Sequence, residues 1–243
     1  MRLFSKIYGI VPAFILLACS GIAQSADWSS TNVSYLSGKG YKSLDKDQPS
    51  SDYDILTIDH ASGWKYGDNF FFTDIFEVDS DSPGSYTEWA PRFSSAKIVE
   101  IDYGSFLKDV LLAGQLNVPT GNPRIYLYGL GMNLAIPHFQ VFSLNTYVRD
   151  DRRFDGTAYQ VTLVWKAIID FGAKFIFTGF MDYAGEEGSN DNKSSGNLLA
   201  QPQLLWQVAE DLGVGIEYQY WKNKLGVEGI TESVPQLMLK WTL

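Results

Sequence analysis

Apolar and polar residues alternate with a period of two over most of the chain from Trp28 onward. Near residue 180, for example, Phe175, Phe177 and Tyr183 occupy odd positions, while Lys174 and Asp182 occupy even ones. Successive side chains of a β-strand point to opposite faces, so such segments have one apolar face and one mostly polar face. Helical periodicity is scarce, and only residues 98–110 could hold a short helix. The pattern therefore predicts an all-β protein.

The alternating segments number about twelve, and most are close to the roughly ten residues of a strand that crosses a membrane. We expect strands at 28–37, 53–65, 70–78, 86–95, 109–118, 124–135, 139–149, 157–168, 171–184, 198–208, 212–222 and 232–243.

The connections between these segments alternate in length. Longer ones, rich in Gly, Ser, Asn and Asp, are expected at 38–52, 79–85, 119–123, 150–156, 185–197 and 223–231. Tight turns are expected between them at 67–69, 136–137, 169–170 and 210–211. The segment 96–108 is an exception, because it is long where a short turn is expected. Long loops at one end and short turns at the other are typical of an outer-membrane barrel with both termini in the periplasm.

A secreted β-sandwich also alternates, so it is the alternative for this pattern. Three features favour a membrane barrel. Aromatic residues lie at strand ends on the apolar face, as in interfacial girdles: Trp64, Tyr66, Trp89, Tyr126, Tyr159, Trp165, Tyr183, Trp206, Tyr220 and Trp241. The other face carries charges in mid-strand, where a sandwich core would be apolar: Glu88, Arg92, Lys174, Glu217 and Lys240. The last strand is amphipathic, with Leu239, Trp241 and Leu243. We expect a transmembrane, antiparallel, up-and-down β-barrel over residues 26–243.

Residues 1–25 are typical of a cleaved signal peptide. Arg2 and Lys6 form a basic region, and the apolar stretch 7–18 is too short to span a bilayer as a helix. The small residues around 23–25 predict cleavage before Ala26. The alternative is a lipobox ending at Cys19, which would then carry a lipid.

Composition excludes several kinds of function. The chain has 19 basic and 28 acidic residues and a net charge of -9, which is unfavourable for nucleic-acid binding. Cys19 is the only cysteine, and His60 and His138 are the only histidines. We therefore expect no metal site and no cofactor. No nucleophile with an adjacent base can be recognised, so we expect no catalytic residues and no enzyme activity.

Three segments in order resemble one protein family. Glu88–Ser94 (EWAPRFS) is similar to the Glu-x-Glu-Pro-Arg-Phe-Ser stretch of the nucleoside-specific channel-forming outer-membrane proteins, the Tsx-like family with its OmpK-like relatives. Tyr128–Gly131, followed by Pro137 and 143–147, resembles the family's next hairpin, and 177–180 resembles a later strand. The resemblance implies a monomeric twelve-stranded barrel in a Gram-negative outer membrane that passes nucleosides. Ala90 departs from the pattern, because the family has a second acid there.

The predicted inner face mixes aromatic residues with both signs of charge. Its members are Phe72, Asp74, Phe76, Glu88, Arg92, Asn145, Tyr147, Arg149, Phe180, Asp182, Glu217 and Trp221. A nucleoside needs aromatic faces for its base and polar groups for its sugar. We assign stacking to Phe72, Tyr147 and Phe180, and hydrogen bonding to Asp74, Asn145 and Asp182.

A structural interpretation of the same residues stays open. Glu88 and Arg92 complete the predicted ligand-binding set. They share one face of a strand, so they could instead form an ion-pair network with charges on neighbouring strands. Asp74 and Asp182 could likewise only balance Arg92, Arg149 and Lys174, and the aromatic residues could be packing.

The sequence as a whole predicts an outer-membrane diffusion channel for nucleosides or similar small polar solutes. The alternative is a non-conducting structural or receptor barrel at which a phage or colicin docks. Expected partners are outer-membrane lipid and lipopolysaccharide. The acidic residues Glu186, Glu187 and Asp191 predict a solvated loop that could hold divalent cations between lipopolysaccharide phosphates.

Overall fold

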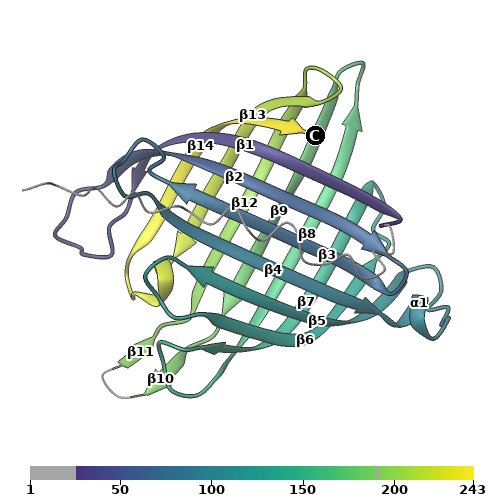
Figure 1. Cartoon of the computed structure of the whole chain (residues 1–243), viewed down its shortest axis with the longest axis horizontal. Helices are drawn as coiled ribbons and strands as arrows, with labels where there is room; N and C mark the ends of the chain where they lie inside the picture. Colours follow the sequence, from purple (N-terminus) through teal and green to yellow (C-terminus); the bar gives the residue numbers. More distant parts are fainter. Residues whose placement is uncertain (1–25, 190–191) are drawn as a thin grey trace, which may run out of the picture.

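The computed structural model describes residues 26–189 and 192–243. This part of the chain forms a closed, antiparallel barrel of twelve strands (Figure 1). The barrel strands are β1 (Trp28–Tyr41), β2 (Ser51–Trp64), β3 (Gly67–Phe76), β4 (Gly84–Ser94), β5 (Leu107–Pro119), β6 (Ile125–Leu134), β7 (Phe139–Asp151), β8 (Ala158–Asp170), β9 (Lys174–Ala184), β12 (Asn197–Gln207), β13 (Leu212–Lys222) and β14 (Thr231–Thr242). The all-β barrel fold is confirmed.

Each strand pairs with the strand that follows it in the ring, and β1 closes the ring against β14. Between β9 and β12 the chain forms a separate hairpin of β10 (Glu187–Ser189) and β11 (Asn192–Ser194). Closure removes the exposed strand edges that would otherwise leave backbone groups unpaired in lipid.

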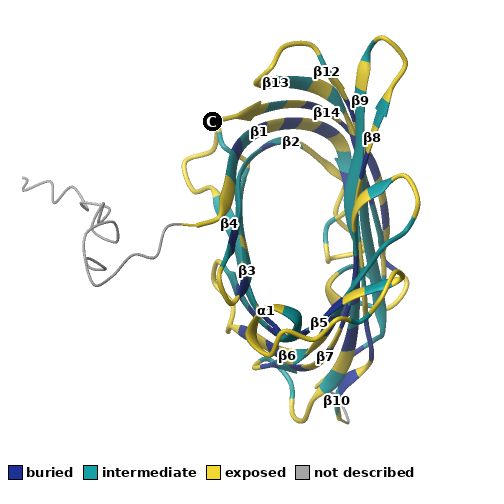
Figure 2. Ribbon diagram, turned by 90° about the vertical axis from the view of Figure 1, so that its right-hand side faces the viewer, coloured by how far each residue is buried: buried dark blue, intermediate teal, exposed yellow. Residues whose placement is uncertain are grey.

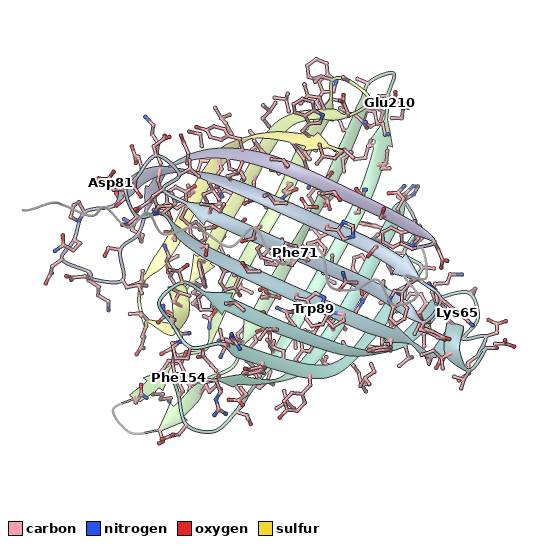
Figure 3. All side chains as sticks on the ribbon, in the orientation of Figure 1. Lys65, Phe71, Asp81, Trp89, Phe154 and Glu210 are labelled. Atoms are coloured by element: carbon pink, nitrogen blue, oxygen red, sulfur yellow. The ribbon has the colours of Figure 1, made fainter. Side chains whose placement is uncertain are left out.

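Inward and outward side chains alternate as the sequence predicts. In β14, Val234, Gln236 and Met238 are buried inside the barrel, whereas Leu237 and Leu239 are exposed outside it. Figure 3 shows the outer wall of β3 and β4 with Phe71 and Trp89 labelled between the two ends of the barrel. The register that directs Glu88 and Arg92 inward and Trp89 outward is thus confirmed.

The outer wall suits an apolar solvent. Large side chains such as Leu237 (71% exposed) and Leu112 (62% exposed) cover it, more than a water-soluble monomer leaves uncovered. Its polar groups bond to one another: Thr31 with His60 at 2.8 Å, Thr73 with Thr87 at 2.8 Å, and Trp89 with Asn69 at 2.5 Å. Such mutual pairing is expected in a bilayer core, because no water is present there to bond to polar groups.

The connections differ between the two ends of the barrel (Figure 1). The longer ones lie at the end where β1 finishes, which we take as extracellular, and the shorter turns lie at the other end. The segment between β4 and β5 is the long exception, as predicted, and it contains α1 (Ser95–Ile98). The β13–β14 connection contains a short 3₁₀ turn, η1 (Lys224–Gly226).

Three local predictions are wrong. The turn expected at 67–69 lies at 65–66, because Gly67 already pairs with Trp64 and faces the backbone of Phe93. The turn expected at 169–170 lies at 171–173, where Gly172 has a φ of 87°. The helix expected within 98–110 is instead Ser95–Ile98, and it begins there because the hydroxyl of Ser94 caps its first turn by accepting a bond from the Lys97 N–H.

No helix within 26–189 or 192–243 is long and apolar enough to span a bilayer. The predicted signal peptide and the Cys19 alternative lie outside the described residues, so cleavage before Ala26 stays a prediction.

The barrel is flattened in cross-section. Seen from its periplasmic end in Figure 2, the ring is longer in one direction, with β3 and β4 along one long side and β8 along the other. Inside one end of this ellipse, Leu36, Ile55 and Met238 belong to an apolar cluster, and a second cluster surrounds Tyr147. Side chains therefore fill both ends of the ellipse and leave its centre for solvent.

Close pairing of β6 with β7 requires a glycine, and this can be tested. A Cβ added at Gly129 would overlap the carbonyl oxygen of Thr146, whereas one at Gly114 on β5 would meet nothing nearer than 3.9 Å. We expect Gly129→Ala to destabilise the barrel by about 1–3 kcal/mol and Gly114→Ala to change its stability by less than about 1 kcal/mol. Heat-modifiable gel mobility across a urea series measures both, and equal midpoints for the two variants would contradict the packing argument.

Candidate functional site

A cavity of about 340 Å³ lies in the extracellular half of the lumen. Its walls come from strands all around the ring. Aromatic members are Tyr53, Phe72, Phe76, Tyr86, Phe180 and Trp221; acids are Asp74, Glu88 and Asp182; amides are Asn117, Gln160, Asn197, Gln201 and Gln219; cations are Arg149, Arg153 and Lys224. The cavity thus joins flat apolar faces with many hydrogen-bonding groups.

Phe72 and Phe180 belong to opposite walls of this cavity. Phe72 is on β3 and Phe180 is on β9, and these strands are six places apart in the ring of twelve. The two walls face each other across the short direction of the ellipse (Figure 2). Phe72 also packs against Tyr86, with ring centroids 6.0 Å apart. A flat molecule that enters from outside therefore meets aromatic faces on both sides.

The three cavity acids are bonded by neutral donors. Thr57 donates to Asp74 at 2.5 Å, Tyr86 donates to Glu88 at 2.7 Å, and Thr162 donates to Asp182 at 2.5 Å. Within the described residues, none of the three carboxylates forms a salt bridge. The prediction that Glu88 pairs with a charge on a neighbouring strand is wrong. Neither Asp74 nor Asp182 is within salt-bridge distance of a cation in the part of the chain that the structure describes.

The arginines have nearer partners. Arg92 on β4 makes a bidentate pair with Asp68 on β3, at 2.7 and 2.8 Å, which confirms its ion-pair role. Its guanidinium also donates to Ser143 at 2.6 Å and to Asn145 at 3.2 Å on β7. This reach over β5 and β6 is possible because Gly131 of β6 carries no side chain.

Arg149 belongs to a second cluster, at the extracellular mouth. It pairs with Asp151 at 2.7 Å and with Glu187 of the β10–β11 hairpin, and Arg153 also pairs with Asp151, at 2.6 Å. Burial raises the pKa of Glu187, and the hydrogen bond to Asp151 raises the pKa of Arg153. The cluster fixes the hairpin to the mouth of the barrel.

The acidic loop differs in part from the prediction. Glu187 is only 2% exposed and its carboxylate also accepts the backbone N–H of Asp151, so it is not a solvated group. Its neighbour Glu186 is exposed and pairs with Lys193 at 2.5 Å. Asp191 lies outside the described residues. The contact of this hairpin with Arg149 and Asp151 buries Glu187, and sequence alone does not show that contact.

Five of the eight predicted ligand-binding residues line the cavity: Phe72, Asp74, Glu88, Phe180 and Asp182. The other three lie closer to the β4–β7 end of the ellipse. Arg92 and Asn145 bond to each other, and Tyr147 is only 5% exposed and packs with Ala113, Ile125 and Leu127. The position of Tyr147 therefore suits packing, and it does not place the ring against a solute in this cavity.

Several cavity residues escaped the sequence analysis. Tyr86, Gln160, Gln201 and Gln219 were not among the predicted inner residues. Strand parity could have found Tyr86, two positions from Glu88, and Gln219, two positions from Glu217. Amides also surround Glu217, which accepts from Gln203 at 2.6 Å, from Gln236 at 3.1 Å and from Gln201 at 3.2 Å.

Ala90 stands between Glu88 and Arg92 on the inner face of β4, where the resemblance leads one to expect an acid. It pairs with Phe70 of β3, whose ring is 40% exposed. Phe70 lies 6.0 Å from Phe72 between ring centroids, so the aromatic surface continues below the cavity toward the periplasm. Among the described residues, no group of three or more His, Cys, Asp or Glu side chains is placed to hold a metal ion.

The family model described as "Nucleoside-specific channel-forming protein, Tsx" matches residues 27–236. None of the curated proteins matches the chain significantly.

Several solved structures share the barrel fold. The NanC porin has a TM-score of 0.58 at 11% identity, over 87% of this chain and 100% of its own. The KdgM porin has a TM-score of 0.52 at 10% identity, over 87% of this chain and 99% of its own. The outer membrane phospholipase A from Escherichia coli has a TM-score of 0.57 at 8% identity, over 88% of this chain and 96% of its own. At these identities the likeness concerns the fold alone.

The Arg92–Asp68 pair should be important for stability. Both side chains are largely covered, so Asp68→Asn leaves the guanidinium without its counter-charge, and we expect a loss of about 1–3 kcal/mol. The exposed pair between Arg152 and Asp150 is the matched control, and Arg152→Gln should cost less than about 1 kcal/mol. Urea unfolding in detergent, followed by tryptophan fluorescence, measures both. A loss for Asp68→Asn no larger than that of the control would refute the assignment.

Proposed function

The chain belongs to the family of nucleoside-specific channel-forming proteins, Tsx, and it is an outer-membrane channel for small solutes. We propose that these solutes are nucleosides or polar molecules of similar size. The observation that carries the proposal is the cavity between Phe72 and Phe180. A base that stacks on an aromatic ring gains about 1–3 kcal/mol.

The polar lining suits the rest of a nucleoside. Asp74, Glu88 and Asp182 offer acceptors to sugar hydroxyls, and Gln160 and Gln201 offer both donors and acceptors to base edges. Each acid also has a protein donor, so a solute competes for bonds that already exist. Weak binding of this kind favours passage, because a channel must release what it binds.

One similar barrel supports passage of polar solutes in general. The KdgM porin is described in complex with disordered oligogalacturonate, and its TM-score with this chain is 0.51 at 10% identity. We carry over from it only the idea that a barrel of this size admits small polar molecules.

We also propose that the chain is not an enzyme. His60 lies on the outer wall, bonded to Thr31, and His138 lies in the turn between β6 and β7. Neither position places an imidazole beside a nucleophile in the lumen. The likeness to a phospholipase concerns the fold and not its chemistry.

The stacking role can be tested with paired variants. We expect Phe72→Ala and Phe180→Ala each to lower the flux of adenosine into liposomes about threefold or more relative to a sugar of similar size, since each loses one stacking face. Phe71→Ala, on the outer wall beside Phe72, is the control and should leave the ratio unchanged. Unchanged ratios in both cavity variants would remove the stacking role. Absence of any flux through a folded barrel would instead favour a structural or receptor barrel.

Charge should separate nucleosides from nucleotides. Because no salt bridge among the described residues neutralises the cavity acids, we expect adenosine to pass faster than its monophosphate. The double variant Glu88→Gln with Asp182→Asn should raise monophosphate flux about twofold or more, with little effect on adenosine. Glu210→Gln, in the periplasmic β12–β13 turn, is the matched control. Equal flux of both solutes through the native protein would contradict the charge argument.

A further inference from the structure

The extracellular connection between β9 and β12, which contains the β10–β11 hairpin, is bonded to its neighbours on both sides. On the β7 side, Glu187 accepts from the Arg149 guanidinium and from the backbone N–H of Asp151, the latter at 2.8 Å. The side-chain amide of Asn192 donates to the carbonyl of Arg153 at 2.9 Å. The connection is therefore held against the end of β7 and the chain that follows it.

On the β13 side, the same connection meets η1. The backbone N–H of Ser195 donates to the carbonyl of Gly226 at 2.8 Å. The side-chain amide of Asn223 donates to the carbonyl of Gly196, also at 2.8 Å. Figure 1 shows the hairpin beside the β13–β14 connection at the extracellular end. Three successive connections are thus joined along one side of the mouth.

These connections form part of the cavity wall. Ser194 of the hairpin and Lys224 and Leu225 of η1 line the cavity, together with strand residues such as Tyr86 of β4. Lys224 is fixed by its pair with the buried Glu232 of β14, at 2.7 Å. Because β4 is five places from β13 in the ring of twelve, a solute that enters from outside passes between the joined connections and the strands that face them.

We propose that the β9–β12 connection sets the size of the largest solute that can enter this channel, and that Glu187 positions it. The proposal rests on the channel function argued above, and it adds a size limit at the mouth to the chemical selectivity of the cavity. Selectivity of a pore depends on its diameter as well as on the groups that line it. A connection that is bonded on both sides keeps the entrance narrow, whereas a released connection yields to larger solutes.

Glu187 suits this role because it is a buried, charged contact that the barrel wall can lose. Removal of one partner abolishes a buried ion pair, so the contact is lost and not merely weakened. Arg149 still pairs with Asp151 at 2.7 Å, and Asp151 still pairs with Arg153 at 2.6 Å. Loss of the Glu187 carboxylate should therefore release the connection while β7 stays bonded and the barrel stays folded.

The test measures the entry of solutes of increasing size into liposomes that contain the full protein. The probes are adenosine and uncharged glucose oligomers, from the disaccharide to the tetrasaccharide. We expect Glu187→Ala to raise tetrasaccharide flux about threefold or more, while adenosine flux changes less than about twofold. Adenosine is little affected because Glu187 is not among the described residues that line the cavity.

Glu186→Ala is the matched control. Glu186 is the preceding acid of the same connection, but it is exposed and pairs with Lys193 of the same hairpin, at 2.5 Å. Its loss leaves the bonds to β7 and to η1 in place. The flux of every probe should therefore match that of the native protein.

A second variant releases the other side of the connection. Asn223→Asp removes the amide that donates to Gly196, but it keeps an oxygen for the backbone N–H of Gly229, at 3.0 Å in the native protein. The tetrasaccharide should again gain more than adenosine. Heat-modifiable mobility shows that each variant is folded, and if Glu187→Ala does not fold, Asn223→Asp decides alone.

The outcomes separate the size limit from the channel function. Native flux of every probe in both release variants, with adenosine still passing, overturns the size limit and leaves the channel function intact. Equal gains for adenosine and the tetrasaccharide also overturn it, because the entrance would then not select by size. The same holds if Glu186→Ala gives the gain expected of Glu187→Ala. A folded native barrel that passes neither adenosine nor any sugar refutes both proposals. Preferential entry of the larger sugars in the release variants supports the size limit.

Discussion

The hydrogen-bonded ring of strands is the constraint on which the rest of this structure depends. Hydrocarbon offers no partner to a backbone N–H or C=O, so every strand needs two neighbours and the first must meet the last. The pairing of β1 with β14, from Asn32 opposite Thr242 to Gly38 opposite Gln236, meets this demand. Once the ring is closed, the period of two assigns each side chain to lipid or to lumen. The mutual bonds of Thr31 with His60 and Thr73 with Thr87 follow from the same demand.

Flattening of the ring decides how the lumen is used. At one end of the ellipse, Gly129 and Gly131 let strands and side chains approach, so Arg92 reaches from β4 to β7 and Tyr147 is enclosed. Across the short direction the walls stay apart, and the cavity forms between β3 and β9. Inner-face residues at this end of the ellipse are therefore bonded or packed against one another, whereas those between β3 and β9 line a cavity that solutes can enter.

The charges inside the barrel fall into two kinds with different consequences. Paired groups, such as Arg92 with Asp68, hold distant strands together and contribute little net field. Acids bonded by neutral hydroxyl groups, such as Asp74 and Glu88, line the cavity without a salt bridge in the described residues. Neutral donors therefore leave these acids able to exchange partners with the hydroxyls of a solute.

The sequence by itself determined the fold class, the strand parity and the asymmetry of the connections, because these follow from local alternation and turn chemistry. Parity placed Phe72, Glu88 and Phe180 on the inner face. It could not place the turn at 65–66 or the start of α1, which depend on cross-strand register and on a cap. Only the tertiary structure decided which inner residues are neighbours: Asn145 binds Arg92, and Glu187 folds back onto Arg149. The physical reason is that a ring brings together residues far apart in the chain, and its curvature, not its alternation, sets the distances across the lumen.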